Sequence, residues 1–207
     1  MNSLPLFRIA VFGAGFLSMA CAQKQELGLT LGGVLSQQRE SSVGNLDLGG
    51  GLALQANYGY RVVDARSAAL YIETHFLANS LRDIRAGNSN ASRDVATLFV
   101  TPGLRLKFFP RRAISPFGAV GGGYALYEQS TLTIGGAPNP APRFTHRGAF
   151  DFGGGIDTPF WRFVGLRAEV RDFYTGNPSF NAPLSAGGQH NVVAGGGIVL
   201  RFGRGEH

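Results

Sequence analysis

The segment 163–174 alternates strictly between two kinds of residue. Its even positions include Val164, Leu166, Ala168 and Val170, and its odd positions include Gly165, Arg167, Glu169 and Arg171. A period of two predicts a β-strand with one apolar and one polar face. If the apolar face contacts lipid, a slip of one residue in register would move both arginines into the hydrocarbon, at roughly 2–4 kcal/mol each near the bilayer midplane. The register of this strand is therefore strongly specified.

Six further segments alternate in a similar way, and a seventh, 116–127, is mostly Gly, Ala and aromatic residues, so its two faces are ambiguous. The eight predicted strands are 26–34, 52–62, 70–76, 97–108, 116–127, 150–156, 163–174 and 192–202. Their lengths bracket the roughly 9–11 residues with which a tilted strand crosses a membrane. Pro102 cannot donate to a ladder, so we expect a bulge there. No stretch after residue 22 sustains a 3.6-residue period, and the sequence therefore predicts an all-β protein.

The connections between these strands alternate between long and short. The long ones are 36–47, 78–94, 128–147 and 175–189, and the short ones are 63–66, 109–115 and 157–162. In transmembrane barrels the short turns face the periplasm and the long loops face outside. This alternation predicts an eight-stranded antiparallel up-and-down transmembrane β-barrel.

A soluble eight-stranded barrel, such as a lipocalin-like binder, would show the same period, and two features favour the membrane. The polar faces carry mainly Gly, Ala, Thr, Asn and Gln, whereas a solvated face usually carries many charges; only 15% of all residues are charged. Aromatic residues gather near both ends of the strands, as expected at membrane interfaces. One band comprises Phe76, Tyr124, Tyr127, Phe150, Phe173 and Tyr174, and the other Tyr58, Tyr60, Phe108, Phe160, Trp161 and Phe202.

The first 22 residues have the layout of a secretory signal peptide. One positive charge precedes an uncharged, mostly apolar run, 9–19, and small residues stand at the −3 and −1 positions before a cleavage site after Ala22. The run is too short to span a membrane as a helix. In the alternative, Cys21 would be the lipidated first residue of a lipoprotein, although Ser18 then stands where leucine is usual. Cleavage after Ala22 leaves residues 23–207 as one barrel domain without cysteine.

Composition excludes several other classes. The net charge of +6 could suggest nucleic-acid binding, but the arginines are spread singly, with only Arg111 and Arg112 adjacent, so no nucleic-acid partner is expected. A single cysteine excludes an internal disulfide and a multi-cysteine zinc site. The glycine runs 121–123, 153–155 and 195–197 lie inside strands, where glycine permits sharp curvature, and are not phosphate loops.

The polar faces place nine charged side chains inside the predicted barrel. They are Arg61, Glu73, Arg105, Lys107, Asp151, Arg167, Glu169, Arg171 and Arg201. Because buried ions must be paired, we predict a structural network in which Glu73 and Glu169 accept from Arg167 and Arg105, and Asp151 accepts from Arg171. Strand direction places Glu73, Arg167 and Glu169 near mid-barrel and the Asp151–Arg171 pair nearer the long loops. Since eight strands enclose just enough room for side chains, a pore is not expected.

The chain resembles the small outer-membrane β-barrel family of OmpA-type transmembrane domains and OmpX-like proteins. The resemblance is carried by the signal peptide, the eight strands, the run A-E-V-R-D-F-Y at 168–174 and the last strand, G-G-I-V-L-R-F, which ends at Phe202. It implies the bacterial outer membrane as location, membrane lipids and lipopolysaccharide as partners, and the barrel insertion machinery, which reads a terminal aromatic residue. Here residues 203–207 follow Phe202, and we expect no further domain after them.

The resemblance implies no particular activity, so we expect a structural or surface-interaction role, with the partner of the loops left open. No cofactor, metal site or catalytic residue is predicted: His75, His146, His190 and His207 lie on different elements without metal-ligand spacing. Some eight-stranded barrels modify lipid A with a serine and a histidine near the outer rim. The alternatives are therefore such an enzyme, pairing Ser130 with His146 or Ser185 with His190, and a narrow channel.

Overall fold

A computed structural model of the chain describes residues 25–41, 44–87, 89–178, 180–181 and 187–202. The predicted signal peptide, Ser185 and His207 lie outside these residues. The described part of the chain consists of strands and connections. Within it, no helix is long and apolar enough to cross a membrane.

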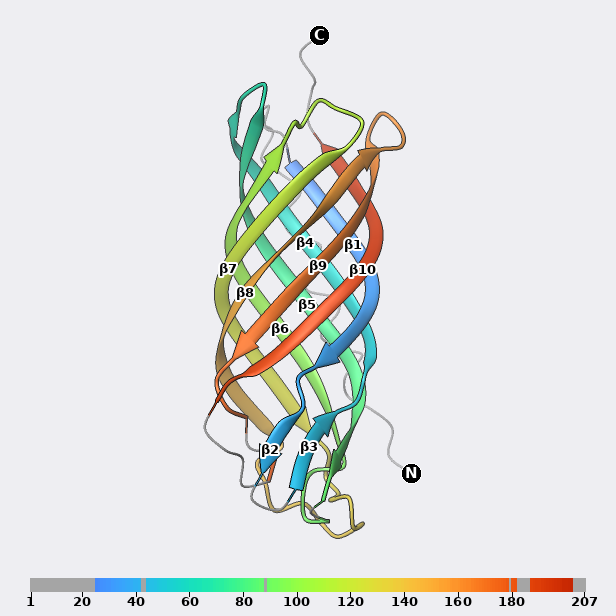
Figure 1. Cartoon of the computed structure of the whole chain (residues 1–207), viewed down its shortest axis with the longest axis vertical. Coiled ribbons are helices and arrows are strands. Elements are labelled where there is room, and N and C mark those ends of the chain that lie inside the picture. The colour runs from blue at the N-terminus through green and yellow to red at the C-terminus, as the bar shows by residue number, and fades with distance from the viewer. Residues whose placement is uncertain (1–24, 42–43, 88, 179, 182–186, 203–207) are drawn as a thin grey trace.

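Eight strands close into an antiparallel barrel (Figure 1), as predicted. The barrel strands are β1 (Gln25–Ser36), β4 (Gly51–Asp64), β5 (Ala68–Ala86), β6 (Asp94–Phe108), β7 (Ser115–Gln129), β8 (Phe144–Pro159), β9 (Val164–Thr175) and β10 (Gln189–Phe202). Each pairs with its neighbours in the chain, β1 with β10 completes the wall, and a hairpin of β2 (Arg39–Ser41) and β3 (Gly44–Leu48) is attached to β5. The predicted fold class is confirmed.

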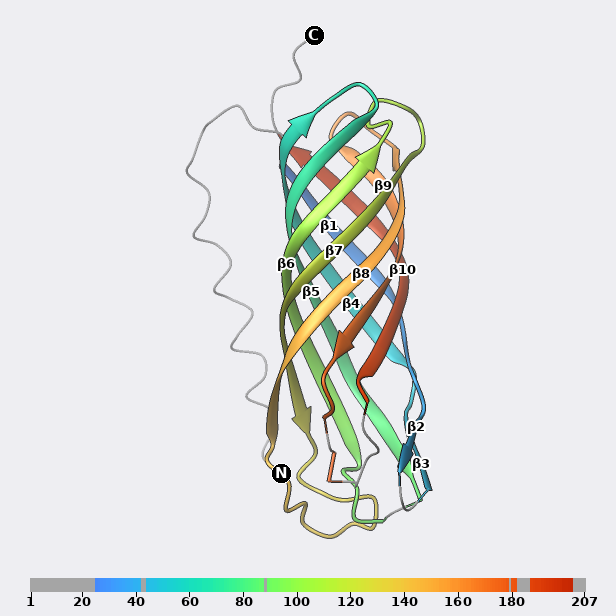
Figure 2. The same ribbon diagram turned by 60° about the vertical axis from the view of Figure 1, so that its left-hand side comes forward.

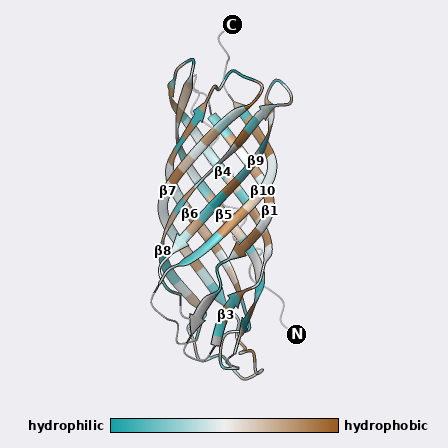
Figure 3. Cartoon of the chain, in the orientation of Figure 1, coloured by the Kyte–Doolittle hydropathy of each residue, from teal (hydrophilic) through white to brown (hydrophobic). Residues whose placement is uncertain are grey.

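Side chains alternate between the interior and the outer surface along each strand. On β9 the odd positions are buried, whereas Leu166 and Val170 are 42% and 53% exposed. Outward residues of other strands are equally exposed, such as Leu52 at 62% and Leu104 at 48%. Figure 3 shows the resulting mixture of hydrophobic and hydrophilic positions along the strands. An apolar surface of this extent on every side of a barrel is suited to lipid and not to water.

β5 is much longer than the predicted strand 70–76. It continues through the first half of the predicted loop 78–94 and there pairs with β3, so that the wall extends beyond the other strands (Figure 2). A bulge between Asn79 and Arg82 shifts the register. Odd positions are buried before the bulge, but Arg82 and Ile84 are buried after it. Because the buried positions change from odd to even at the bulge, the segment shows no continuous alternation in the sequence.

Pro102 does not produce the expected bulge. β6 keeps one register with β7 from Val100 to Gly103, and the ladder is only interrupted at the proline, which has no N–H to donate. The two strands approach closely here, because a Cβ placed on Gly123 would collide with the carbonyl oxygen of Val100. Glycine on the neighbouring strand thus accommodates the proline without a bulge.

The connections separate the barrel into two different ends. The short turns 65–67, 109–114 and 160–163 lie at one end, at the top of Figure 1, and the β2–β3 hairpin and the described parts of the connections after β5, β7 and β9 belong to the other. The alternation of long and short connections is therefore as predicted, although strand β5 takes up much of the second long one.

Candidate functional site

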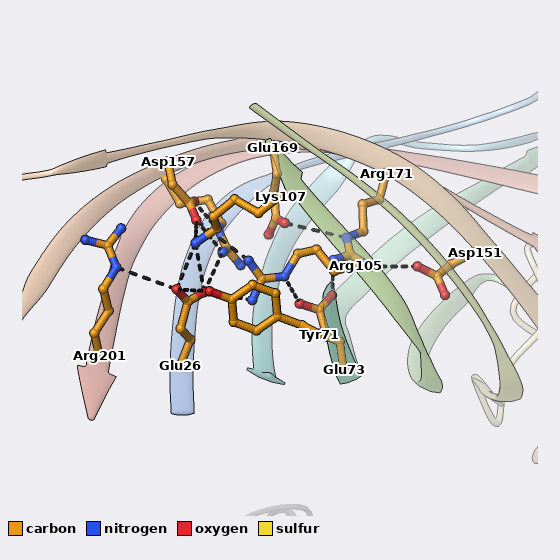
Figure 4. A network of polar contacts seen from close by, with 11 residues as sticks. Glu26, Tyr71, Glu73, Arg105, Lys107, Asp151, Asp157, Glu169, Arg171 and Arg201 are labelled. Atoms are coloured by element: carbon orange, nitrogen blue, oxygen red, sulfur yellow. Dashed lines mark hydrogen bonds and ion pairs between the residues drawn. The ribbon is translucent and has the colours of Figure 1, made fainter. Parts of the chain in front are cut away.

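Arg105 of β6 occupies the centre of a charged network inside the barrel (Figure 4). It is fully buried, and its Nε and Nη2 donate to Glu73 at 2.5 Å and to Glu26 at 2.8 Å. Its Nη1 lies 3.7 Å from Asp157. The guanidinium carbon lies 4.3 Å from the ring centroid of Tyr71, whose hydroxyl donates to Glu26. One arginine thus joins three strands and an aromatic ring.

A second group of ions lies beside Arg105, toward the short turns. Lys107 Nζ donates to both carboxylate oxygens of Glu26, at 2.8 and 3.0 Å, and lies 2.6 Å from Asp157. Arg167 binds the same aspartate with two nitrogens, at 2.7 and 2.9 Å. Such bidentate pairing fixes both side chains and strengthens the interaction. Asp157 therefore connects β6, β8 and β9.

A third group lies toward the long loops and is organised by Arg171. Its Nη1 donates to Asp151 at 2.8 Å, its Nη2 donates to Glu73, and its Nε lies 3.5 Å from Glu169. Glu73 accepts from both Arg105 and Arg171 and so joins this group to the centre.

The structure forms two of the predicted pairs and replaces the third. Arg105 meets Glu73, and Arg171 meets Asp151. Arg167 does not bind Glu73 or Glu169 as expected, but pairs with Asp157. Asp157 on β8 lies directly opposite Arg167 on β9. Glu169 is on the same strand as Arg167, two residues farther along.

Glu26 and Asp157 are the two carboxylates that the sequence prediction missed. Glu26 shares its parity with Thr30, on the polar face of the first predicted strand, and Asp157 shares its parity with Asp151. Glu26 already begins the predicted strand 26–34, so its parity alone would have placed it inside, and extending the predicted strand 150–156 by one residue would have added Asp157. The two remaining predicted ions lie near the short-turn end: Arg61 pairs with Asp64 at 3.2 Å, and Arg201 lies 3.6 Å from Glu26.

The network is balanced in charge. Its five carboxylates are Glu26, Glu73, Asp151, Asp157 and Glu169, and its five cations are Arg105, Lys107, Arg167, Arg171 and Arg201. All but Arg201 are nearly inaccessible to solvent. Isolated buried ions cost several kcal/mol each, and a neutral set in which each ion lies near one of opposite charge reduces that cost.

The half of the interior nearer the long loops holds a cluster of aromatic rings among buried polar side chains such as Arg82 and Gln129. Phe99 packs against Phe173 and Tyr127, with ring centroids 5.1 and 6.0 Å apart, and Phe180 packs against Tyr127 at 5.7 Å. The four rings are fully buried, and aliphatic side chains surround them. We call these four residues the aromatic plug. Tyr127 and Phe173 were expected in an aromatic band on the outer surface, but strand parity directs both inward.

The connections at the long-loop end are bonded to one another. The segment 89–93 pairs with 132–135 through Arg93 N to Leu132 O at 3.1 Å and Ile134 N to Ala91 O at 2.9 Å. Ser92 N also donates to the carbonyl oxygen of Phe180, at 3.1 Å. Residues from three different connections therefore form one platform above the aromatic plug.

The residues considered for catalysis do not come together as expected. Ser130 Oγ accepts from the backbone N–H groups of Arg93 and Asp94 and donates to Leu132 O, which ties it to the platform. His146 instead hydrogen-bonds to Tyr124 on the outer surface. The other proposed serine, Ser185, lies outside the described residues.

Two further histidines lie apart from these residues. His190 Nδ1 lies 2.6 Å from Asp172 Oδ2 on the outer surface. His75, inside the barrel, lies 3.2 Å from Gln55. Among the described residues, no group of three or more His, Cys, Asp or Glu side chains could hold a metal ion.

Comparisons with known proteins agree on the fold. No protein-family model matches the chain, and a search of curated proteins also found no match. Neisserial surface protein A is similar, with a TM-score of 0.53 and 12% identity over 86% of this chain and 97% of that protein. The outer membrane protein OprG from Pseudomonas aeruginosa gives a TM-score of 0.52 and 12% identity over 88% and 97%. The chain therefore has the fold of small outer-membrane β-barrels, which confirms the resemblance predicted from the sequence.

Proposed function

We propose that the protein is an integral barrel of the bacterial outer membrane that presents a surface platform and has neither a channel nor a catalytic role. The observation that carries this proposal is the contrast between an apolar outer face and a filled interior. The outer face suits acyl chains, and the interior is occupied by the ion network and the aromatic plug. The barrel is thus a support for what its loops present.

The filled interior argues against conduction. A permeating ion would have to separate buried ion pairs such as Arg105–Glu73, and then pass the apolar contact of Phe99 with Phe173. Apolar constrictions exclude ions because no group replaces the lost hydration shell. The side chains of an eight-stranded barrel already fill its interior, which supports the same view.

The platform supports a role in surface interaction. Its backbone hydrogen bonds hold residues 89–93 and 132–135 together, and Asn181 Nδ2 donates to Asn90 O at 2.7 Å. A preorganised surface loses less entropy on binding than separate loops would. Lipopolysaccharide and host or bacterial surface molecules are the partners that such a position allows.

Two observations support a role without catalysis. Ser130 Oγ is engaged by three backbone groups, and His146 pairs with Tyr124, so neither forms a nucleophile–base pair with the other. His190 and Asp172 form a base–acid pair, but within the described part of the chain no serine or threonine hydroxyl hydrogen-bonds to that histidine.

Electrical recording in planar bilayers tests this proposal most directly. The purified protein, shown to be folded by different gel migration before and after boiling, should give no unitary current steps, whereas a general porin added to the same bilayer should. Lipid A from an overexpressing strain should have the same mass spectrum as lipid A from the parent strain. Regular current steps would overturn the closed barrel, and a shifted acyl-chain mass would overturn the absence of catalysis.

A further inference from the structure

We propose that the short-turn end of the barrel binds the phosphate groups of anionic phospholipids. This inference rests on the proposed membrane location of the barrel. It assigns a ligand class to the rim formed by residues 64–67, 109–114 and 160–163, which we call the turn rim.

Two of the three turns carry the same arrangement of side chains. In one, the guanidinium of Arg112 lies 5.0 Å from the ring centroid of Phe109. In another, that of Arg162 lies 5.1 Å from the ring centroid of Phe163. Stacking on a ring orients a guanidinium while leaving its N–H groups free for a phosphate. Both arginines are exposed, and among the described residues no carboxylate lies within ion-pair distance of either.

The aromatic side chains place this site at the edge of the lipid. Phe160 and Trp161 are 70% and 74% exposed, and Phe163 and Ile114 are 54% and 60% exposed. Large apolar side chains so accessible at the end of an apolar outer face are expected to lie among lipid headgroups and the adjoining acyl chains. The neighbouring arginines then lie at the level of the phosphates.

The turn rim and the opposite end of the barrel differ in net charge. The turn rim holds four arginines and one carboxylate, namely Arg66, Arg111, Arg112, Arg162 and Asp64. The long connections 37–50, 83–94, 128–147 and 175–189 together hold five arginines and five carboxylates: Arg39, Arg85, Arg93, Arg143 and Arg147, with Glu40, Asp47, Asp83, Asp94 and Glu128. The basic end of the protein is therefore the end that the proposed orientation places in the phospholipid leaflet.

Arg143 at the long-loop end supplies a natural comparison. It also lies over a ring, 5.5 Å from the centroid of Phe144, but it is neutralised by Glu128, whose Oε1 accepts from it at 2.6 and 3.0 Å. Among the residues that the structure describes, Arg111 is the one turn-rim arginine with such a partner, Asp64 at 3.3 Å. Arg112 and Arg162 thus keep their positive charge available for an external anion.

A lipid phosphate fits this site better than the acidic peptides of the cell wall. The turns are short, with three, six and four residues between strands, so they do not reach far from the membrane surface. The free guanidinium groups are also stacked on the rings that we expect to lie in the interface. A basic side chain near an anionic membrane surface contributes a roughly fivefold preference, reduced by screening.

The chain offers its own reporter for the test. Trp161 is its single tryptophan and is adjacent to Arg162. The full mature barrel is reconstituted into mixed vesicles, and quenching of Trp161 by brominated phosphatidylglycerol is compared with quenching by brominated phosphatidylcholine. We expect the anionic lipid to be preferred at least about threefold, and the preference to fall as NaCl is raised from about 50 to about 500 mM.

Matched variants assign the preference to residues. Arg112→Ala/Arg162→Ala should lower the preference toward one, Arg112→Lys/Arg162→Lys should retain part of it, and Arg143→Ala should leave it unchanged. Gel migration before and after boiling verifies that each variant folds.

The possible failures are distinguishable. If neither brominated lipid quenches Trp161, the barrel is not in the bilayer and the proposed function itself fails. If both lipids quench equally in the unaltered protein, or if the salt dependence is absent, only the lipid site is overturned. A response of Trp161 to purified peptidoglycan, without any lipid preference, would also overturn it and would point to the cell wall instead.

Discussion

Replacing Glu26 with glutamine removes one negative charge from the interior at nearly constant volume. The carboxylate accepts hydrogen bonds from Arg105 at 2.8 Å, from Lys107 at 2.8 and 3.0 Å and from Tyr71 at 3.1 Å, and it is 5% exposed. After the change, the network would hold five cations and four carboxylates. The substitution therefore tests whether charge balance inside the barrel determines its stability.

The magnitude follows from the geometry. At 2.8 Å and an effective dielectric constant of about 20, one ion pair is worth about 6 kcal/mol. The desolvation of Glu26 itself, several kcal/mol, is no longer incurred in the variant and offsets much of that loss. Measurements on buried pairs that lose one partner centre on roughly 3–5 kcal/mol. We therefore expect Glu26→Gln to lower the free energy of unfolding by about 3 kcal/mol.

Equilibrium unfolding in phospholipid vesicles measures this loss. Urea titrations followed by Trp161 fluorescence and by gel migration should agree. Glu128→Gln is the matched control, because its partner Arg143 is half exposed and such pairs contribute at most about 1 kcal/mol. Adding Lys107→Met to Glu26→Gln restores the charge balance of the network. The free energy of unfolding of the double variant should therefore fall by less than the sum of the losses of the two single variants. A Glu26→Gln variant within about 0.5 kcal/mol of the unaltered protein would refute the reasoning.

Three further predictions follow from the same structure. Gly197→Ala should strongly reduce refolding yield, because its Cβ would collide with the backbone of β1, whereas Gly33→Ala, with open space around it, should refold normally. Phe173→Ala should lower the free energy of unfolding by roughly 3–5 kcal/mol in urea titrations, because it leaves a cavity in the aromatic plug. Asp172→Asn should change that free energy by less than about 1 kcal/mol, because its partner His190 is partly exposed, and an unaltered lipid A mass spectrum in this variant would agree with a non-catalytic pair.

The barrel could be predicted from the sequence because a period of two survives in most of the wall strands. Leu166 and Arg167 differ in environment only because adjacent residues of a strand face opposite sides. The prediction failed where the phase changes or where a strand was ended too early. The bulge after Asn79 concealed the end of β5 nearer the long loops, and the polar residues around Asp157 resembled a turn.

The sequence predicted which charged side chains point into the barrel better than it predicted which of them form ion pairs. Parity places Arg105, Arg167 and Glu169 on the inner face, but the choice of partner depends on register between strands. Arg167 meets Asp157 because the β8–β9 register puts them opposite each other, and no local pattern encodes that alignment. The aromatic plug was missed for a similar reason, since the glycine-rich strand containing Tyr127 has no clear alternation.

The platform could not be predicted from sequence at all. Residues 131–136 contain a local turn signal that ends in Gly135–Gly136, but nothing in the sequence indicates that 132–135 pairs with 89–93, because the two are joined by backbone hydrogen bonds that any residue can form. Short polar segments of this kind reveal their partners only when the barrel brings their ends together. The surface that we propose for interaction therefore became visible only in the structure.

Collision of spin labels with probes of different solubility tests most directly whether the outer face of the barrel contacts lipid. Nitroxides attached at Leu104→Cys and Leu166→Cys, with Thr131→Cys in the exposed loop as control, are measured in vesicles against oxygen, which concentrates in hydrocarbon, and a nickel chelate, which stays in water. Both leucines point outward and are exposed at the protein surface. The account predicts frequent oxygen collisions and almost no nickel collisions at 104 and 166, and the reverse at 131. Free access of the nickel chelate to 104 and 166 would contradict it.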